Sequence, residues 1–251
     1  MSEFLTDSSD IFGGWFNEWR IARVQKLENI LSNHRDGVKT VLECGAGFGN
    51  VGLHFKSTGA EVTMSDLREE CLDEIRKKDG DANVVCINHE KDWSLETKFD
   101  LVIHMGLSCH LENWKQDLLC TINSSKKWIV FETAVNKFSN DITFKIENPK
   151  YHHEWHGPGT FQGTPTTGSL PSVSAIEGIL DQFKLSYTRF DDTDLNVHNL
   201  IYTDKCDKPF IFPKNEDGET IEPPFIVDGW DNPAVSGGRK FWMIKKNLIT
   251  V

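Results

Sequence analysis

The stretch VLECGAGFGNVG, residues 41–52, places four glycines directly after a short apolar run. We expect a short buried strand over residues 40–43 and a helix over residues 50–58, so the glycines fall in the loop between them. Glycine has no Cβ, and such a loop lets the main chain turn sharply and come close to a ligand. The stretch therefore predicts a ligand-binding loop at the carboxyl end of a strand.

The chain on both sides of this loop alternates between helix patterns and strand patterns. An amphipathic helix is expected before the loop, over residues 17–33, because apolar residues recur there at intervals of three to four. After the loop we expect helices at 67–78 and 111–122, and strands at 62–65, 84–87, 101–104 and 128–131. Connections of this length favour a parallel sheet that helices cover on both faces.

The last part of the chain adds a helix and two strands between long irregular stretches. The patterns indicate a helix at 173–183 and strands at 185–190 and 241–244. We expect one domain over residues 1–251, with a helical segment at 1–35 and two insertions at 135–171 and 193–239. Irregular loops of this length in a compact domain are typically functional, so the insertions are expected to cover the active site.

Composition and charge narrow the classes of partner. The formal net charge of −11 opposes binding to phosphate backbones, which requires clustered Lys and Arg. No stretch approaches the ~20 uncharged apolar residues that span a bilayer, and no signal-peptide pattern is present. We therefore expect a soluble, cytoplasmic protein that acts on a small molecule. The six cysteines form no C-x-x-C pair, which favours reduced core thiols over disulfides or a zinc site.

Two motifs overlap in the glycine loop. Gly47, Gly49 and Gly52 form G-x-G-x-x-G, the spacing with which dinucleotide-binding enzymes bring a pyrophosphate to a helix N-terminus. Glu43 followed by Gly45, Gly47 and Gly49 instead resembles the first motif of class I S-adenosylmethionine-dependent methyltransferases, an acid followed by G-x-G-x-G. That resemblance implies that Glu43 bonds toward the cofactor ammonium and that the glycines let the main chain pass close to the cofactor. A carboxylate suits a cationic ligand and would repel a pyrophosphate.

The string FDLVIHMGLSCHL, residues 99–111, separates the two alternatives. It is similar to the fourth-strand motif of small-molecule members of the same methyltransferase family. The resemblance implies an α/β, Rossmann-like fold with a seven-stranded, mostly parallel sheet, an antiparallel last strand and helices on both faces. It also implies that Met105 and Gly106 line the methyl-transfer site. Asp100 is expected to have a structural role, capping or pairing at the start of the strand.

The resemblance further implies how the adenosine part of the cofactor is held. Asp66, with Leu67 beside it, ends the second strand, where an acid can accept bonds from both ribose hydroxyls; a helix N-cap is the alternative role. The family usually has an Asp that binds the adenine amino group, and this chain has Asn88 there. His89 is placed to offer its backbone N–H to the adenine ring, and Asp92 is a competing candidate for the amino group.

Three further groups are candidates for binding or chemistry. His110 is the predicted general base, because it follows the fourth strand and imidazole titrates near neutral pH; packing against the next helix is the alternative. The run YHHEWH, residues 151–156, has the residue types of a metal site. Its spacing and flanking Pro and Gly favour a lid that contacts substrate. A metal site and an inert surface loop are the alternatives, and no metal ligand is assigned. Arg20 is placed to hold the cofactor carboxylate, and a solvated helix position is an equal alternative.

Together these features predict a methyltransferase that uses S-adenosylmethionine as its cofactor. The expected acceptor is an oxygen or nitrogen of a small molecule. Two alternatives remain open: a nicotinamide-dependent oxidoreductase, and a non-catalytic S-adenosylmethionine-binding protein whose insertions contact a partner. Neither nucleic acid nor a membrane is expected as a partner, and the sequence makes no prediction about the oligomeric state.

Overall fold

The computed structural model describes residues 2–6, 13–34, 37–146, 166–191 and 236–246. The strands of its main sheet are β1 (Thr40–Cys44), β2 (Glu61–Asp66), β3 (Asn83–Cys86), β4 (Phe99–Met105), β5 (Ser125–Asn136), β8 (Ser186–Asp191) and β9 (Ser236–Lys245). The α-helices are α1 (Glu3–Thr6), α2 (Gly13–Leu31), α3 (Asn50–Ser57), α4 (Glu69–Lys78), α5 (Trp114–Ser124) and α7 (Val173–Gln182). A 3₁₀ helix, η2 (Ser108–His110), lies between β4 and α5, and a second sheet pairs β6 (Ile142–Ile146) with β7 (Thr166–Leu170).

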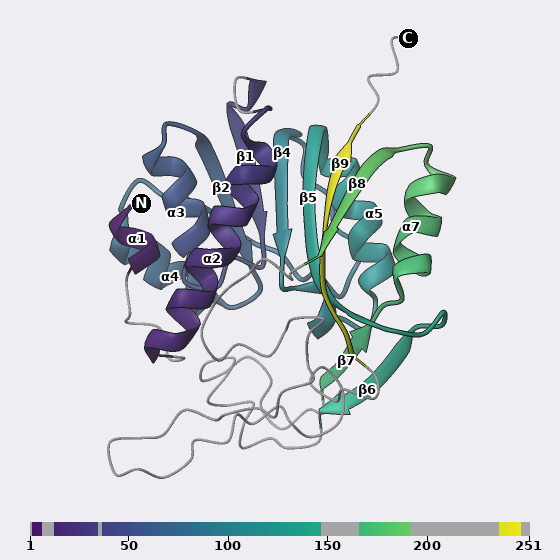
Figure 1. Ribbon diagram of the computed structural model, residues 1–251. Helices are drawn as coiled ribbons and strands as arrows, with labels where there is room; N and C mark the ends of the chain where they lie inside the picture. Colours follow the sequence, from purple (N-terminus) through teal and green to yellow (C-terminus); the bar gives the residue numbers. More distant parts are fainter. Residues whose placement is uncertain (1, 7–12, 35–36, 147–165, 192–235, 247–251) are drawn as a thin grey trace.

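The main sheet has seven strands in the order β3-β2-β1-β4-β5-β9-β8 (Figure 1). Each of the first four neighbouring pairs, from β3·β2 to β4·β5, is parallel. β9 lies between β5 and β8 and runs antiparallel to both. The predicted α/β, Rossmann-like fold with a mostly parallel sheet and an antiparallel last strand is therefore confirmed.

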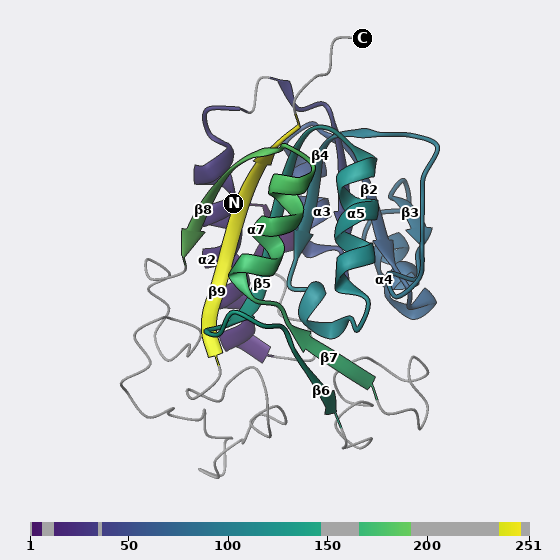
Figure 2. The ribbon, with the colours of Figure 1, turned by 90° about the vertical axis from the view of Figure 1, so that its right-hand side faces the viewer.

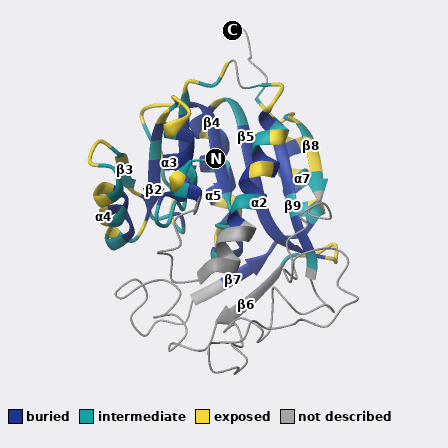
Figure 3. Ribbon diagram, turned by 60° about the vertical axis from the view of Figure 1, so that its left-hand side comes forward, coloured by how far each residue is buried: buried dark blue, intermediate teal, exposed yellow. Residues whose placement is uncertain are grey.

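Helices cover both faces of the sheet. Figure 2 shows α5 and α7 in front of the sheet, with α2 and α3 behind it. The face toward α5 and α7 buries a cluster that includes Leu42 and Trp242, whereas the opposite face buries one that includes Val41 and Met243. Successive strand residues point to opposite faces, so adjacent residues enter different cores. The central strands are accordingly buried along most of their length (Figure 3).

Helix α4 shows how the sequence pattern determines the local structure. Glu69 and Glu70 lie in its first turn and basic residues fill its last turn, an order that the helix dipole favours. Cys71, Leu72 and Ile75 are buried, which is the apolar stripe expected from the helical spacing. The predicted helix over residues 67–78 is thus confirmed, with its first residue at Glu69.

The structure corrects part of the irregular stretch expected over residues 135–171. β5 continues to Asn136, and β6 pairs with β7 inside the predicted insertion over 135–171. ITFKI in β6 alternates apolar residues with Thr and Lys, a strand signal, whereas TTGSL in β7 carries no clear alternation. The helix expected from residue 111 begins at Trp114, because η2 forms first. Of the second predicted insertion, over 193–239, only residues 236–239 are described, and they belong to β9.

Candidate functional site

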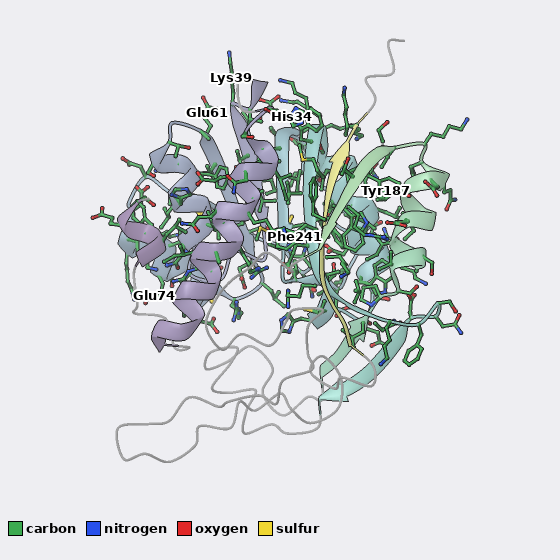
Figure 4. The ribbon with its side chains drawn as sticks, viewed as in Figure 1. His34, Lys39, Glu61, Glu74, Tyr187 and Phe241 are labelled. Atoms are coloured by element: carbon green, nitrogen blue, oxygen red, sulfur yellow. The ribbon has the colours of Figure 1, made fainter. Side chains whose placement is uncertain are left out.

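The carboxyl ends of the parallel strands define the edge at which the candidate site lies. Figure 4 labels Lys39 and Glu61, next to the starts of β1 and β2, at the top of the view. The parallel strands therefore end toward the bottom, where Figure 1 shows β6 and β7. β7 packs against η2, so part of the first insertion reaches the loop that follows β4.

Charged groups gather at this edge on the face of the sheet that α2 covers. Val41 and Val130 belong to the core beside α2. The two-residue period of a strand brings Glu43 and Glu132 to the same face two residues further along. In β9, Met243 belongs to the same core, and Arg239 lies four residues before it. Arg239 therefore points to the same face of the sheet. The face is apolar in the middle of the sheet and charged at its carboxyl edge.

Glu43 is the acid at the end of β1, and only 6% of its surface is exposed. Its Oε2 accepts a hydrogen bond of 2.8 Å from the main-chain N–H of Gly52. A Cβ added to Gly52 would lie 2.5 Å from the same oxygen, so glycine is needed for α3 to approach the carboxylate. Burial raises the pKa of Glu43 to about 8; Asp66 adds to the rise, while the Gly52 amide and Arg20 oppose it.

The glycine loop has a left-handed backbone, with φ of 65° at Gly45, 55° at Gly47 and 72° at Gly49. Residues with a side chain rarely adopt these angles. A Cβ at Gly49 would lie 2.6 Å from Ile75 Cγ1, so this glycine also permits α4 to pack. At Gly47 the nearest atom to an added Cβ is 3.8 Å away, in the guanidinium of Arg68. The main chain at Gly47 is therefore the more open part of the loop.

Asp66 ends β2 and already has several hydrogen-bond donors. Its carboxylate accepts bonds from the Gly47 N–H at 2.8 Å and from the Arg68 N–H at 3.0 Å. The Arg68 side chain adds two more, at 2.9 and 3.1 Å. Burial alone would raise the pKa of Asp66, but the bonds and charge of Arg68 outweigh burial and lower it. A ribose at Asp66 would therefore replace the Arg68 guanidinium, beside Leu67, which is 38% exposed.

The two predicted adenine contacts lie in the loop after β3. Asn88 Oδ1 accepts a bond of 3.0 Å from the main-chain N–H two residues later, which fixes a turn. His89 is 3% exposed, and its ring Nδ1 forms a hydrogen bond of 2.6 Å with Asp117 Oδ1. The side chain of His89 is therefore part of the buried interior. The competing Asp92 accepts a bond from Gln116 of α5 at 3.0 Å. The adenine roles of Asn88 and His89 stay predictions.

His110, the predicted base, ends η2 and is partly exposed. Burial, together with the positive charges of Arg239 and Arg68, lowers the pKa of His110 to about 3. The imidazole is therefore neutral at physiological pH and has a lone pair that can accept a hydrogen bond. Met105, the predicted transfer-site residue, ends β4 five positions earlier and is also partly exposed.

A buried ion cluster, Arg23–Glu132–Arg239, was missed by the sequence analysis. Glu132 is fully buried and bonds Arg23 of α2 and Arg239 of β9. A Cβ at Gly106 would lie 3.1 Å from Arg23 Nη2 and 3.4 Å from Arg239 Nη2, so the cluster borders the residue after Met105. The available signal was a lone acid inside the apolar strand WIVFETAV, which requires a buried cation.

Other expectations have mixed outcomes. Asp100 is structural, as predicted, because its Oδ2 accepts bonds from the N–H groups of Lys39 and Thr40 at 3.0 and 3.2 Å. Residues 151–156 lie outside the described residues. Within the described part of the chain, no three His, Cys, Asp or Glu residues gather as a metal site. No helix of that part is long and apolar enough to cross a membrane.

The groups at this edge fit S-adenosylmethionine. Glu43 offers a buried carboxylate for a cation, Gly47 an approachable main chain, and Asp66 a second carboxylate beside the apolar surface of Leu67. In its ionised form the same acid would repel a pyrophosphate at the loop. Together with the strand order, the site defines a class I S-adenosylmethionine-dependent methyltransferase fold.

Comparison with known proteins agrees. A family model described as a methyltransferase domain matches residues 16–188. The chain therefore belongs to this methyltransferase-domain family. No curated protein matches the sequence.

Several solved structures are similar to this chain. Magnesium protoporphyrin IX methyltransferase (ChlM) from Synechocystis PCC 6803, with bound SAH, has 14% identity and a TM-score of 0.53, over 96% of this chain and 91% of that chain. Coclaurine N-methyltransferase bound to N-methylheliamine and SAH has 13% identity and a TM-score of 0.56, over 92% of this chain and 73% of that chain. The DhpI-SAM-HEP complex has 11% identity and a TM-score of 0.52, over 96% of this chain and 92% of that chain. At this identity the likeness shows the shared fold.

Proposed function

We propose that this chain methylates an oxygen or nitrogen of a small-molecule acceptor, with S-adenosylmethionine as the donor. The observation that carries the proposal is the buried carboxylate of Glu43 next to a glycine loop whose main chain is open at Gly47. This arrangement suits a cationic ligand, and it opposes the nicotinamide-dependent alternative because an ionised Glu43 would repel a pyrophosphate at the loop.

We assign each residue at this edge to one part of the cofactor. Glu43 would hold its ammonium and Asp66 its ribose, with the main chain of Gly45, Gly47 and Gly49 alongside. Leu67, Asn88 and His89 would flank the adenine, and Met105 would line the transfer site. When bound, the cofactor supplies a methyl group on a positively charged sulfur. The chain itself mainly aligns the acceptor and excludes water.

His110 is assigned as the general base for acceptors that must lose a proton. Burial and the charges of Arg239 and Arg68 keep its imidazole neutral, so one ring nitrogen carries an N–H and the other has a lone pair that can take a proton. With its pKa lowered to about 3, the ring is a weaker base than an imidazole that titrates near neutral pH. A small-molecule acceptor also agrees with coclaurine N-methyltransferase, which shares the fold and holds N-methylheliamine. The formal net charge of −11 disfavours nucleic acid as the acceptor.

Thermal unfolding of the full chain with candidate ligands tests the proposed cofactor. A ligand at 100 times its Kd stabilises the native state by about 2.7 kcal/mol, so S-adenosylhomocysteine is expected to raise the Tm and NAD is not. Glu43→Ala is expected to remove the shift, whereas Glu61→Ala, at the opposite edge in Figure 4, should keep it. A Tm raised by NAD alone would reverse the assignment. Tight cofactor binding without transfer to a broad acceptor panel would favour the non-catalytic alternative.

Substitution of His110 tests the proposed base. With an acceptor from the panel, His110→Ala is expected to lower kcat about 10²–10⁴-fold, the usual contribution of a general base. The Kd of S-adenosylhomocysteine should change little. His34→Ala is the matched control, because His34 lies at the opposite edge of the sheet (Figure 4). Full activity in His110→Ala would remove the assignment.

A further inference from the structure

Residues in the loop after β3 bond the start of α5. Asp92 accepts a hydrogen bond of 3.0 Å from Nε2 of Gln116, in the first turn of α5. Glu90, two residues earlier in the loop, instead bonds the short segment between η2 and α5. That segment directly follows His110, the predicted base. Glu90 therefore joins the loop after β3 to the loop after β4.

Glu90 holds this segment with both of its carboxylate oxygens. Oε1 accepts a bond of 2.7 Å from the main-chain N–H of Glu112, and Oε2 accepts one of 3.0 Å from that of Asn113. Asn113 also donates through its side-chain Nδ2 to the main-chain oxygen of Glu90, at 3.2 Å. Three bonds between residues 22 or 23 positions apart thus fix one loop against the other.

The start of α5 is held by this neighbouring loop instead of by its own side chains. Asn113 is the N-cap residue and Gln116 lies three residues later, the arrangement of a capping box, in which each side chain bonds the main-chain N–H of the other residue. The Asn113 side chain makes no such bond, and the Gln116 side chain donates to Asp92. Glu90 accepts the bond from the Asn113 N–H that a capping box would give to residue 116.

The two joined loops carry groups that are assigned to different parts of the site. Asn88, two residues before Glu90, is assigned to the adenine, and its Oδ1 accepts a bond of 3.0 Å from the Glu90 N–H. On the other side, His110 lies two residues before Glu112, with the buried Leu111 between them. The bonds of Glu90 therefore form a short connection between the predicted adenine turn and the predicted base.

We propose that Glu90 is a positioning residue, which holds His110 at the transfer site and links its position to occupancy of the adenine turn. The proposal rests on the proposed function. Glu90 acts through the main chain of Glu112 and Asn113, which are exposed. Without the carboxylate, their N–H groups bond water instead, and the segment after His110 moves more freely. A general base that moves out of hydrogen-bond reach of its proton loses its effect.

The NMR signal of the His110 ring C2–H, assigned by its loss in His110→Ala, tests the link in the full chain. The probe is 5′-methylthioadenosine, which carries adenosine without the amino-acid part of the cofactor. Binding is expected to shift the signal in wild type, and Glu90→Ala should still bind the nucleoside but lose the shift. Gln116→Ala is the matched control, because it removes the neighbouring bond to Asp92 and should keep the shift. A full shift in Glu90→Ala, or equal loss in both variants, would overturn the proposal.

Titration of the same signal without ligand tests how Glu90 positions His110. Burial and the charges of Arg239 and Arg68 lower the pKa of His110 to about 3, so wild type should not titrate between pH 5 and 8. In Glu90→Ala, greater contact with water should raise this pKa toward the ordinary value of 6.5. Loss of a nearby negative charge would by itself lower the pKa, so a rise reports movement of the ring. An unchanged or lower pKa would refute the positioning role.

Kinetics with an acceptor from the panel provide an independent measure. Glu90→Ala is expected to lower kcat by up to about 10²-fold, the cost of a displacement of about 1 Å, and to leave KM nearly unchanged. In the His110→Ala background the same substitution should cause no further loss, because both act on one group. Glu90→Gln keeps one acceptor oxygen and should be intermediate; it replaces Glu90→Ala if that variant fails to fold. Additive losses in the double variant would contradict the proposal.

The outcomes separate this inference from the proposed function. If neither 5′-methylthioadenosine nor S-adenosylhomocysteine binds wild type, the proposed function fails, and the link to the adenine turn fails with it. The titration without ligand then still decides whether Glu90 positions His110. If the ligands bind and the His110 signal does not respond to Glu90→Ala, this inference alone fails.

Discussion

Glu43 is poised between its two protonation states near neutral pH. Burial is the main cause of its raised pKa of about 8, and the Gly52 amide and Arg20 limit the rise. An ammonium group close to the carboxylate favours the ionised form. Binding of the cofactor should therefore lower this pKa and release a proton, which makes affinity depend on pH.

The pH dependence of cofactor binding follows from this residue. Between pH 6.0 and 7.5, the affinity for S-adenosylhomocysteine is expected to rise with pH, by at most about tenfold per unit for one linked proton. Calorimetry in two buffers with different ionisation enthalpies measures the proton released. 5′-Methylthioadenosine, which lacks the ammonium, should bind with little dependence on pH. Proton uptake on binding would contradict the assignment of Glu43.

Glu43→Gln supplies the complementary variant. The folded-state pKa of Glu43 lies above its ordinary value of 4.5, so its contribution to stability is complete below that value and is lost as the pH rises through about 8. The neutral amide has no such loss. Glu43→Gln should therefore lose stability less than wild type on going from pH 6 to pH 9, while it binds S-adenosylhomocysteine weakly and without proton release.

At the scale of residues, sequence reasoning located groups that lie close together along the chain. Glu43 and the glycines form one continuous motif, and the structure places Asp66 beside them through the Gly47 N–H. The cluster Arg23–Glu132–Arg239 was not predicted from the sequence, because Glu132 lies more than one hundred residues from each arginine. Periodicity shows that a strand carries a buried acid but not which distant cation neutralises it.

At the scale of elements, a buried network connects the sheet with α5. Asp117 of α5 is 0% exposed and bonds the rings of His89 at 2.6 Å and His104 at 2.5 Å. Trp93 Nε1 donates a third bond, at 2.8 Å. His89 in turn contacts Ser65, whose hydroxyl donates to the main-chain oxygen of Glu43. The network thus supports the strands that carry the predicted cofactor residues.

Removal of the Asp117 charge should weaken the whole domain. Asp117→Asn leaves the buried rings without their carboxylate and is expected to lower the free energy of unfolding by about 3 kcal/mol, measured by urea denaturation. Burial alone would raise the pKa of Asp117, but His104 and His89 outweigh burial and hold it below 3.8. Its stabilisation is therefore present above about pH 4 and lost as the pH falls through the lower folded-state pKa.

The difference between wild type and Asp117→Asn should accordingly be constant near neutral pH and shrink in acid. Asp73→Asn is the control, because Asp73 pairs with Arg76 on the exposed side of α4 and should change the free energy of unfolding by less than about 1 kcal/mol. Equal effects of the two substitutions would show that the network contributes no more than a surface ion pair.

Elements with strong periodicity were predicted well, and those determined by tertiary contacts were not. The apolar stripe of α4 and the apolar runs of β1 and β4 predict the bounds of these elements to within a few residues. The pairing of β6 with β7 joins residues that are 20 to 28 positions apart, and β7 has little strand propensity of its own. The late start of α5 depends on η2, a short turn without a periodic signature.

At the scale of the whole molecule, β9 completes the sheet from its interior. It lies between β5 and β8 and buries Phe241, Trp242 and Ile244 completely. Removal of residues 236–251 is expected to abolish cooperative unfolding, because β8 loses its partner and both cores lose large side chains. Near-UV circular dichroism and urea denaturation measure the loss.

The matched truncation removes only residues 247–251. It keeps β9 and Lys246, whose Nζ donates to the carbonyls of Ile122 and Ser125 at 2.7 and 3.0 Å. This variant should unfold with nearly the wild-type midpoint. A cooperative transition in the chain without residues 236–251 would show that the remaining strands form a stable sheet without β9.

The position of β9 also bears on how the protein is made. A ribosome synthesises the glycine loop and both predicted cofactor acids by residue 66, but β9 only near the end of the chain. A prematurely terminated product would carry the residues of the predicted donor site without the strand that joins β5 to β8. A folded donor site would thus be acquired only when the last strand leaves the ribosome.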